Sequence, residues 1–346
     1  MKNRKSGKVG GKGIFPGPRL AVTMGDPAGI GPEIISLALE EEAYRRACLV
    51  IGDIDRLRSG AIQADSNVQY QTVSSIEEIG QTLGKIPVWH VGLEDPSLPF
   101  GTLSADGGEC AYQCIIKGID LALEGSVDAV VTGPINKESL NLAGHLYPGH
   151  TELLGERTGA TDTVMMLAAG SMRALHVTTH IRLLEVPTSI STERILRVLT
   201  LGNEALKRMG IEKPRFAVAA LNPHAGESRM FGDEEEGIIS PAVGKALAKG
   251  ILVEGPVPPD VVFLQMHRGQ YDAVVAMYHD QGHIPLKLLA FETGVNVTLG
   301  LPIIRTSVDH GTAFDIAGKG LADPGSLKEA LRLALLLARD RKGGIR

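Results

Sequence analysis

The stretch 274–320, VVAMYHDQGHIPLKLLAFETGVNVTLGLPIIRTSVDHGTAFDIAGKG, predicts both a fold and a site. It opens with an apolar, β-branched run typical of a fully buried parallel strand, and the run then gives way to polar residues. Two further apolar runs follow, at 295–299 and 300–304. The polar side chains beside these runs are His279, Asp280, Lys287, Asn296 and Arg305. An imidazole, a carboxylate, an amide and two cations at the ends of apolar segments predict a pocket for a small anion and a metal.

The rest of the chain alternates apolar strands with amphipathic helices, which predicts an α/β fold with a largely parallel, helix-covered sheet. The expected strands are 19–24, 48–51, 88–91, 127–131, 164–168, 175–179, 216–221 and 274–277. The expected helices are 109–123, 151–157, 192–209 and 327–338. A length of 346 residues allows two ordinary domains or one large α/β unit.

The composition excludes several classes of protein. Apolar residues make up 43% and charged residues 22%, as expected for a soluble globular protein. The net charge of -5 provides no basic face for nucleic acid or an anionic membrane, and no run of 18 apolar residues predicts a membrane span. The three cysteines form no disulfide framework, so a reducing, cytoplasmic location is expected. Residues 1–18 are basic and Gly-rich, and we expect a disordered leader there.

Two features are typical of anion binding but have alternatives. Residues 25–33, GDPAGIGPE, form a Gly-rich turn, yet this turn has neither the G-x-G-x-x-G nor the G-x-x-x-x-G-K-[ST] spacing. His150 and Thr151 lie at the start of an expected helix, where free backbone N–H groups favour an anion. A purely capping role for Thr151 fits the same spacing.

Three histidines, His180, His224 and His279, each follow an apolar run. Because ligands collect outside the carboxyl ends of strands in α/β sheets, these imidazoles can converge in space. Three imidazoles with an open fourth position form a frequent catalytic zinc site, and they also suit other divalent metals. The alternative is that each is a capping or core residue, as we expect for His176 inside its own strand.

A series of sequence phrases resembles the 4-hydroxythreonine-4-phosphate dehydrogenase family. The phrases are TMGDPAGIGPE, GPINK, YPGHTELL, THIRL, LNPHAGE, MYHDQG and VNVTLGLPIIRTSVDHGTAFDIAG. They run in the same order from about Leu20 to Ala322. The resemblance implies an isocitrate/isopropylmalate dehydrogenase-like fold, with two α/β domains flanking an active-site cleft. We expect residues 19–145 and 300–346 to form the first domain and residues 146–299 to form the second, which holds the metal and substrate site.

The resemblance also implies roles for individual residues. The metal ligands would be His180, His224 and His279, supplied by both subunits of a homodimer with shared active sites. The substrate contacts would be His150, Thr151, Lys287, Asn296 and Arg305. A segment similar to the adenosine-binding loop of isopropylmalate dehydrogenase implies NAD contacts at His310, Gly311, Thr312, Ala313 and Asp315. One divalent metal is implied in each site, with zinc first and manganese, magnesium or cobalt as alternatives. The candidate general bases are Asp280 and Asp260, and Asp280 is alternatively a residue that orients a histidine.

The implied reaction is the NAD-linked oxidation of a secondary alcohol in a four-carbon, 4-phosphorylated hydroxy acid, with decarboxylation. One branch of the family oxidises 4-phosphooxy-L-threonine in pyridoxal phosphate synthesis, and another oxidises D-threonate or D-erythronate 4-phosphate. His283, within DQGHIPLKLL, favours the second branch, because the first more often has leucine there. The rival interpretations are a non-redox acyltransferase of the same fold and a metal-binding protein without catalysis.

Overall fold

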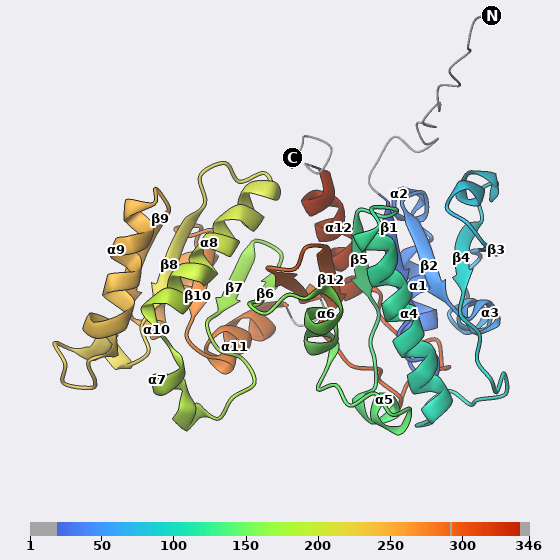
Figure 1. Ribbon diagram of the computed structural model, residues 1–346, viewed down its shortest axis with the longest axis horizontal. Coiled ribbons are helices and arrows are strands. Elements are labelled where there is room, and N and C mark those ends of the chain that lie inside the picture. The colour runs from blue at the N-terminus through green and yellow to red at the C-terminus, as the bar shows by residue number, and fades with distance from the viewer. Residues whose placement is uncertain (1–18, 291–292, 340–346) are drawn as a thin grey trace, which may run out of the picture.

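The computed structural model describes residues 19–290 and 293–339, so the expected leader lies outside the described residues. Within these residues twelve strands form one sheet, in the order β3-β4-β2-β1-β5-β12-β11-β6-β7-β10-β8-β9, with helices packed on both faces (Figure 1). The strands are β1 (Leu20–Thr23), β2 (Cys48–Gly52), β3 (Tyr70–Val73), β4 (Ile86–His90), β5 (Ala129–Thr132), β6 (Val164–Ala169), β7 (Met172–His176), β8 (Arg215–Ala219), β9 (Leu252–Val257), β10 (Ala273–Ala276), β11 (Val295–Leu299) and β12 (Ile304–Val308). The helices are α1 (Gly31–Ala38), α2 (Glu42–Arg45), α3 (Ile54–Gln63), α4 (Ala105–Leu123), α5 (Lys137–Leu142), α6 (His150–Thr158), α7 (Val186–Ser189), α8 (Thr192–Arg208), α9 (Ser240–Ala248), α10 (Pro259–His267), α11 (His279–Ala290) and α12 (Gly325–Ala338). Short helical turns are η1 (Glu77–Gln81), η2 (Leu183–Glu185), η3 (Pro223–Gly226) and η4 (Glu235–Ile239).

Eight of the eleven strand pairs among the described residues are parallel, which confirms the expected largely parallel sheet, but the centre of the sheet is antiparallel. Strand β11 runs antiparallel to both β12 and β6, and β6 runs antiparallel to β7. The connections 170–171 and 300–303 explain this, because such short loops join antiparallel neighbours, whereas parallel neighbours need a long crossover. The strands on either side of this centre pair in parallel, as predicted.

The predicted elements are otherwise confirmed, with three kinds of exception. The strand expected at 175–179 is β7, which begins and ends three residues earlier, at Met172–His176. Strands β3 and β9 were not predicted. Strand β3 has polar residues at its centre, Gln71 and Thr72, and β9 contains Gly255-Pro256, which breaks the strand pattern. Arg305 lies within β12, whereas the sequence placed it after an apolar segment. None of the helices in the described part of the chain combines the length and apolar character needed to cross a bilayer.

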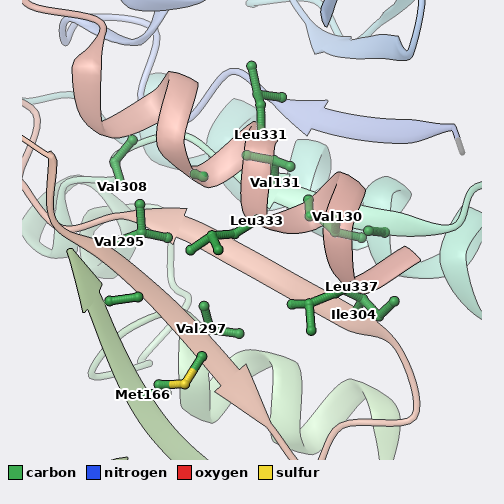
Figure 2. Close-up of a cluster of buried hydrophobic side chains, with 14 of the residues drawn as sticks. Val130, Val131, Met166, Val295, Val297, Ile304, Val308, Leu331, Leu333 and Leu337 are labelled. Carbon is green, nitrogen blue, oxygen red and sulfur yellow. The ribbon is translucent and has the colours of Figure 1, made fainter. Parts of the chain in front are cut away.

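The two central strands β11 and β12 separate the core from a cavity. Their residues at alternate positions, such as Val297 and Ile304, lie in a buried cluster with Leu337 of α12 (Figure 2). Because side chains alternate between the two faces of a strand, the residues between them face the other way. Those facing away from α12 include Asn296, Arg305 and Ser307, which line a cavity. The expected domain boundary at 299/300 falls in the loop between these strands, and the domain limits stay a prediction.

Candidate functional site

Three neighbouring parallel strands, β7, β10 and β8, end at one edge of the sheet. His180 follows β7, His279 opens α11 just after β10, and His224 lies in the turn η3 after β8. The expectation that the three histidines follow strand ends at a common edge is therefore met by the topology.

Two of these histidines lie side by side. The ring centroids of His180 and His279 are 5.8 Å apart. The Nδ1 atom of His279 is 2.7 Å from an oxygen of Asp280, which leaves the Nε2 atom of His279 available. Burial, followed by the nearby His279, lowers the pKa of His180 and so favours the neutral imidazole that a metal requires.

His224 stands apart from this pair. It is exposed, with φ 51° and ψ 28°, in a turn where Ala225 is also left-handed. Among residues 19–290 and 293–339, no three His, Cys, Asp or Glu side chains of one chain are grouped closely enough to hold a metal. A single chain thus presents a pair of imidazoles, and a third nitrogen ligand would have to come from elsewhere.

A cavity of about 310 Å³ lies in front of the imidazole pair. Its lining includes the predicted residues His150, Thr151, His180, His279, Lys287, Asn296, Arg305, His310 and Gly311. Within the described residues, its lining does not include His224, Asp260, Asp280, Thr312, Ala313 or Asp315. All five predicted substrate contacts therefore line one cavity, although the first and the last of them, His150 and Arg305, are 155 positions apart in the sequence.

Arg305 supplies a buried positive charge at the floor of the cavity. The side chain is 2% exposed, and its two Nη atoms donate to the hydroxyls of Thr298 and Thr132, at 3.0 and 2.7 Å. Its Nε atom is buried without a hydrogen-bond partner among the described residues. Burial lowers the pKa of Arg305 to about 9, because only neutral hydroxyls, with Glu152 at longer range, compensate its charge. A buried cation with a spare donor beside a cavity is suited to an anionic ligand.

The start of α6 lies beside Arg305. Gly149 is the N-cap and provides no side chain to cap the first turn, while His150 and Thr151 line the cavity. Burial, followed by the charges of Arg305 and Lys137, holds the pKa of His150 well below its usual range. Its Nε2 atom is buried and has no partner in the described part of the chain. The uncapped helix start and the unpartnered imidazole favour anion binding over a purely capping role for Thr151.

Two further predicted contacts lie across the cavity. Lys287 projects from α11, and its Nζ atom is 3.0 Å from an oxygen of Asp309. The side-chain oxygen of Asn296 is buried and lacks a partner among the residues described. The cavity lining therefore carries the positive charges of Arg305 and Lys287. It also carries the side-chain oxygen of Asn296, which can accept a hydrogen bond from a ligand.

The expected cofactor segment, 310–319, borders the cavity through His310 and Gly311. The buried carboxylate of Glu33, on α1, accepts hydrogen bonds from the backbone N–H groups of Gly318 and Gly320, at 2.6 and 2.9 Å. Thr312 is buried, and its carbonyl accepts a hydrogen bond from the N–H of Ile30. Ala313 has a left-handed φ of 43°, and Asp315 is exposed. The Gly-rich turn 25–33 thus holds this segment in place, which is a structural role that its sequence did not indicate.

The two candidate general bases lie outside the lining of the cavity. Asp280 is exposed and accepts the hydrogen bond of His279, an arrangement that favours the orienting role. Asp260 is exposed in the first turn of α10. Its role stays a prediction.

A family model described as pyridoxal phosphate biosynthetic protein PdxA matches residues 44–334. The chain belongs to the PdxA family. The D-threonate 4-phosphate dehydrogenase of Salmonella typhimurium is 50% identical over 324 residues, which cover 92% of this chain and 98% of the relative. The 4-hydroxythreonine-4-phosphate dehydrogenase of Geobacter metallireducens is 47% identical over 330 residues, which cover 94% and 97%. These relatives confirm that this PdxA-family member is an oxidoreductase of the dehydrogenase class.

The same family includes close structural neighbours. A crystal structure of 4-hydroxythreonine-4-phosphate dehydrogenase from Klebsiella pneumoniae matches with a TM-score of 0.85 and 46% identity, and the match covers 94% of this chain and 100% of that one. The predicted α/β fold is thereby confirmed as the fold of this family.

Four charged or titratable residues that line the cavity of this chain were not among the predicted site residues. They are Lys137, Glu152, His283 and Asp309. Lys137 opens α5 directly after Asn136 caps it, and Asp309 follows the end of β12. Both follow β-branched runs, so the rule that polar residues at strand ends gather at a site could have found them.

Two buried histidines, His176 beneath the cavity and His283 in its wall, make stability depend on pH. Burial, followed by the charge of His283, lowers the pKa of His176 to about 3. Burial, followed by His279, lowers the pKa of His283 to about 4. Both rings are neutral in the fold, whereas an unfolded histidine titrates near ~6.5. Their contribution to stability is complete above that pH and is lost as the pH falls toward their folded pKa values.

We therefore expect the free energy of unfolding of chelator-treated protein to decrease below about pH 6.5. In His176→Leu the decrease per pH unit should be smaller by up to ~1.4 kcal/mol, because one proton fewer is taken up on unfolding. Urea titrations between pH 4 and 7, with about one unfolding curve for each half pH unit, give the free energy of unfolding as a function of pH. His267→Leu, at an exposed position on α10, should keep the wild-type slope. Equal slopes in wild type and His176→Leu would contradict the assignment.

Proposed function

We propose that this PdxA-family protein is a metal-dependent, NAD-linked dehydrogenase. Its substrate would be a four-carbon, 4-phosphorylated hydroxy acid, which it oxidises at the secondary alcohol with decarboxylation. The observation that carries the proposal is Arg305, a buried guanidinium with an unpartnered Nε atom that lines the cavity shared by His150 and the pair His180 and His279. An anion-binding end and an imidazole end in one cavity suit a substrate with a phosphate at one end and a chelating hydroxy acid at the other.

The donor set fits a divalent metal in part. Two neutral imidazoles from one chain, His180 and His279, are the ligand type that zinc prefers, and Asp280 orients one of them. His224 would complete the set from the partner subunit. When bound, the metal would polarise the substrate's hydroxyl group, and NAD would accept the hydride.

The protein's own groups would bind and orient the substrate. Arg305 would donate to the terminal phosphate through Nε, and His150 would donate from the start of α6. Lys287, already positioned by Asp309, would add positive charge. Asn296 would accept a hydrogen bond from a substrate hydroxyl through its unpartnered oxygen. Held at both ends, the reacting carbon would have one orientation toward the segment 310–319, where we place NAD.

The choice of substrate follows the relatives. The D-threonate 4-phosphate dehydrogenase of Salmonella typhimurium is 50% identical, and the 4-hydroxythreonine-4-phosphate dehydrogenase of Geobacter metallireducens is 47% identical. We propose D-threonate or D-erythronate 4-phosphate as the substrate, with 4-phosphooxy-L-threonine as the second candidate. The expected metal-binding and substrate-binding side chains His180, His279 and Arg305 are present in the cavity lining. Their presence favours a dehydrogenase over the non-redox acyltransferase and over a metal-binding protein without catalysis. The free, buried cysteines Cys48, Cys110 and Cys114 accord with the proposed cytoplasmic location.

The experiment measures NADH and carbon dioxide together, with purified protein, NAD, zinc and D-threonate 4-phosphate. We expect both products in equal amounts. NADH without carbon dioxide would remove the decarboxylation from the proposal, and the absence of both with every phosphorylated acid tested would remove the dehydrogenase itself.

A homodimer with shared active sites is part of the proposal. Exposed leucines and isoleucines lie on α11 and on the turn η2, next to His180: Ile284 (64% exposed), Leu288 (83%), Leu183 (68%) and Leu184 (85%). In Figure 1, α11 and α7, which directly follows η2, lie on the same side of the molecule. A second copy packed there would cover this apolar surface beside the imidazole pair.

We expect Leu184→Glu combined with Leu288→Glu to convert a dimer into a monomer with little activity, because a charge buried in an interface without a partner is strongly unfavourable. Light scattering after size-exclusion chromatography measures the mass. Ile62→Glu, at a 76% exposed position on α3, is the matched control and should stay dimeric and active. A double variant that keeps the dimer mass would exclude this surface as the interface.

A further inference from the structure

A ladder of three histidines runs from the core to the cavity. His176, on β7, is fully buried, and its Nδ1 atom is 3.3 Å from the carbonyl oxygen of Met165. Its Nε2 atom is 3.1 Å from the Nδ1 atom of His283, on α11. The ring of His283 in turn stacks on that of His279, with centroids 3.6 Å apart and planes 11° apart.

The hydrogen bonds of this ladder allow one consistent tautomer. A carbonyl oxygen only accepts, so the Nδ1 atom of His176 must carry a hydrogen and donate it to Met165. The Nδ1 atom of His283 is also 3.1 Å from the carbonyl oxygen of His279, so it too carries a hydrogen. It is shared between that carbonyl and the Nε2 atom of His176, which accepts. The Nε2 atom of His283 is left with its lone pair.

That lone pair belongs to a ring at the cavity wall. His283 is 5% exposed and lines the cavity, and its Nδ1 atom is engaged on the protein side. It is also one helical turn after His279 and one turn before Lys287, so these three residues form one row on α11 that faces the cavity.

Gly282 preserves this arrangement. A Cβ atom at position 282 would lie 2.5 Å from the Nε2 atom of His176 and 3.1 Å from the Cβ atom of Ala174. Any larger residue would displace the His176 ring and remove the acceptor of His283. The absence of a side chain at Gly282 therefore leaves space for the buried ring of His176 next to His283.

We propose that His283 is a specificity-determining residue, whose fixed Nε2 acceptor receives a hydrogen bond from a substrate hydroxyl group on the carbon adjacent to the one oxidised. The inference rests on the proposed function and deepens it, because it selects hydroxy acids that carry this second hydroxyl. A ligand with hydrogen in that place leaves a desolvated acceptor unpaired, which costs about 1–3 kcal/mol, or roughly 5- to 150-fold.

The test compares kcat/KM for D-threonate 4-phosphate and for its 2-deoxy analogue, in wild type and in His283→Leu. We expect wild type to prefer the 2-hydroxy acid by roughly 5- to 150-fold, and His283→Leu to reduce that preference to within about threefold. His283→Gln, which keeps an acceptor oxygen, should retain part of the preference. The matched control is His267→Leu, at an exposed position on α10, and it should retain all of it. An unchanged preference in His283→Leu would overturn the proposal.

Two readouts without turnover separate this proposal from the proposed function. Metal content measured by mass spectrometry should be the same in His283→Leu and wild type, and a loss as large as in His279→Ala would make His283 a ligand and overturn the proposal. Nitrogen-15 NMR of labelled histidines in the metal-depleted protein should show His283 protonated at Nδ1 alone, and a hydrogen on Nε2 would overturn it. These signals report on His283 even if no tested acid is oxidised, a result that would count against the proposed function only.

Discussion

Arg305→Met is expected to lower kcat/KM for the phosphorylated substrate by roughly 30- to 5,000-fold, mainly through KM. Removing one partner of a buried, charged hydrogen-bonded pair costs about 2–5 kcal/mol. The guanidinium is the most buried cation of the cavity lining, and its Nε atom has no hydrogen-bond partner within residues 19–290 and 293–339, so a ligand can accept from it. Substrate binding measured by calorimetry, and initial rates with varied substrate and with varied NAD, give the effect on each ligand.

The same substitution should leave the unliganded protein at least as stable as wild type. A buried charge without a carboxylate partner costs desolvation energy, so replacing it with an apolar side chain of similar volume removes that cost. Arg305→Lys should give an intermediate loss of activity, because the ammonium group keeps the positive charge but lacks the planar set of N–H donors of the guanidinium. Arg173→Met is the matched control. This arginine donates to the carbonyls of Ser171 and Asp272 and lies outside the described cavity lining. If Arg305→Met weakened NAD and substrate equally, Arg305 would not belong to a phosphate site.

His224→Ala and His279→Ala are each expected to abolish metal retention and turnover, and their mixture is expected to recover activity. In a mixed dimer with shared sites, one site combines the intact His279 of one subunit with the intact His224 of the other, while the second site lacks both. Random exchange puts about half of the protein into mixed dimers with one working site each, so about a quarter of wild-type activity should return. Unfolding and refolding the two variants together, and measuring rate and metal content, performs the test.

The control for this experiment is a mixture of His180→Ala and His279→Ala. These two residues lie side by side in one chain, so each site of their mixed dimer lacks one ligand and no activity should return. A mixture of His224→Ala and His279→Ala that stays inactive, with dimers confirmed to be mixed, would contradict a site shared between the two subunits.

The sequence indicated which residues surround the cavity more fully than it indicated the strand directions. His180, His279 and the five expected substrate contacts all line the cavity, because polar residues at strand ends, and the family phrases around them, are local signals; their roles stay a prediction. The antiparallel centre of the sheet could not be predicted, because the direction of β11 depends on pairing with β6, more than 120 residues away in sequence. Arg305 was expected after a strand, since an arginine inside an apolar segment normally ends it. Here two threonine hydroxyls and the cavity make its burial possible.

Spacing alone also does not separate His224 from the other two histidines, although the family resemblance implied ligands from both subunits. All three follow neighbouring strands, so spacing alone predicts one cluster. His224 instead lies in a left-handed turn with Ala225 and is absent from the cavity lining of the described chain. The buried His176, in contrast, was correctly predicted as a core residue, but its hydrogen bond to His283 required the three-dimensional structure.

The most direct measurement is the rate of NADH formation with equal concentrations of D-threonate 4-phosphate, D-erythronate 4-phosphate and 4-phosphooxy-L-threonine. It is made with metal-depleted protein before and after addition of zinc, manganese, magnesium or cobalt. We predict no turnover without metal, and after metal addition a higher kcat/KM for one of the two sugar acids than for the amino acid. A preference for 4-phosphooxy-L-threonine would reassign the substrate to the pyridoxal branch. Undiminished turnover by the metal-depleted protein, or none with any of the three acids despite bound metal, would contradict the central claim.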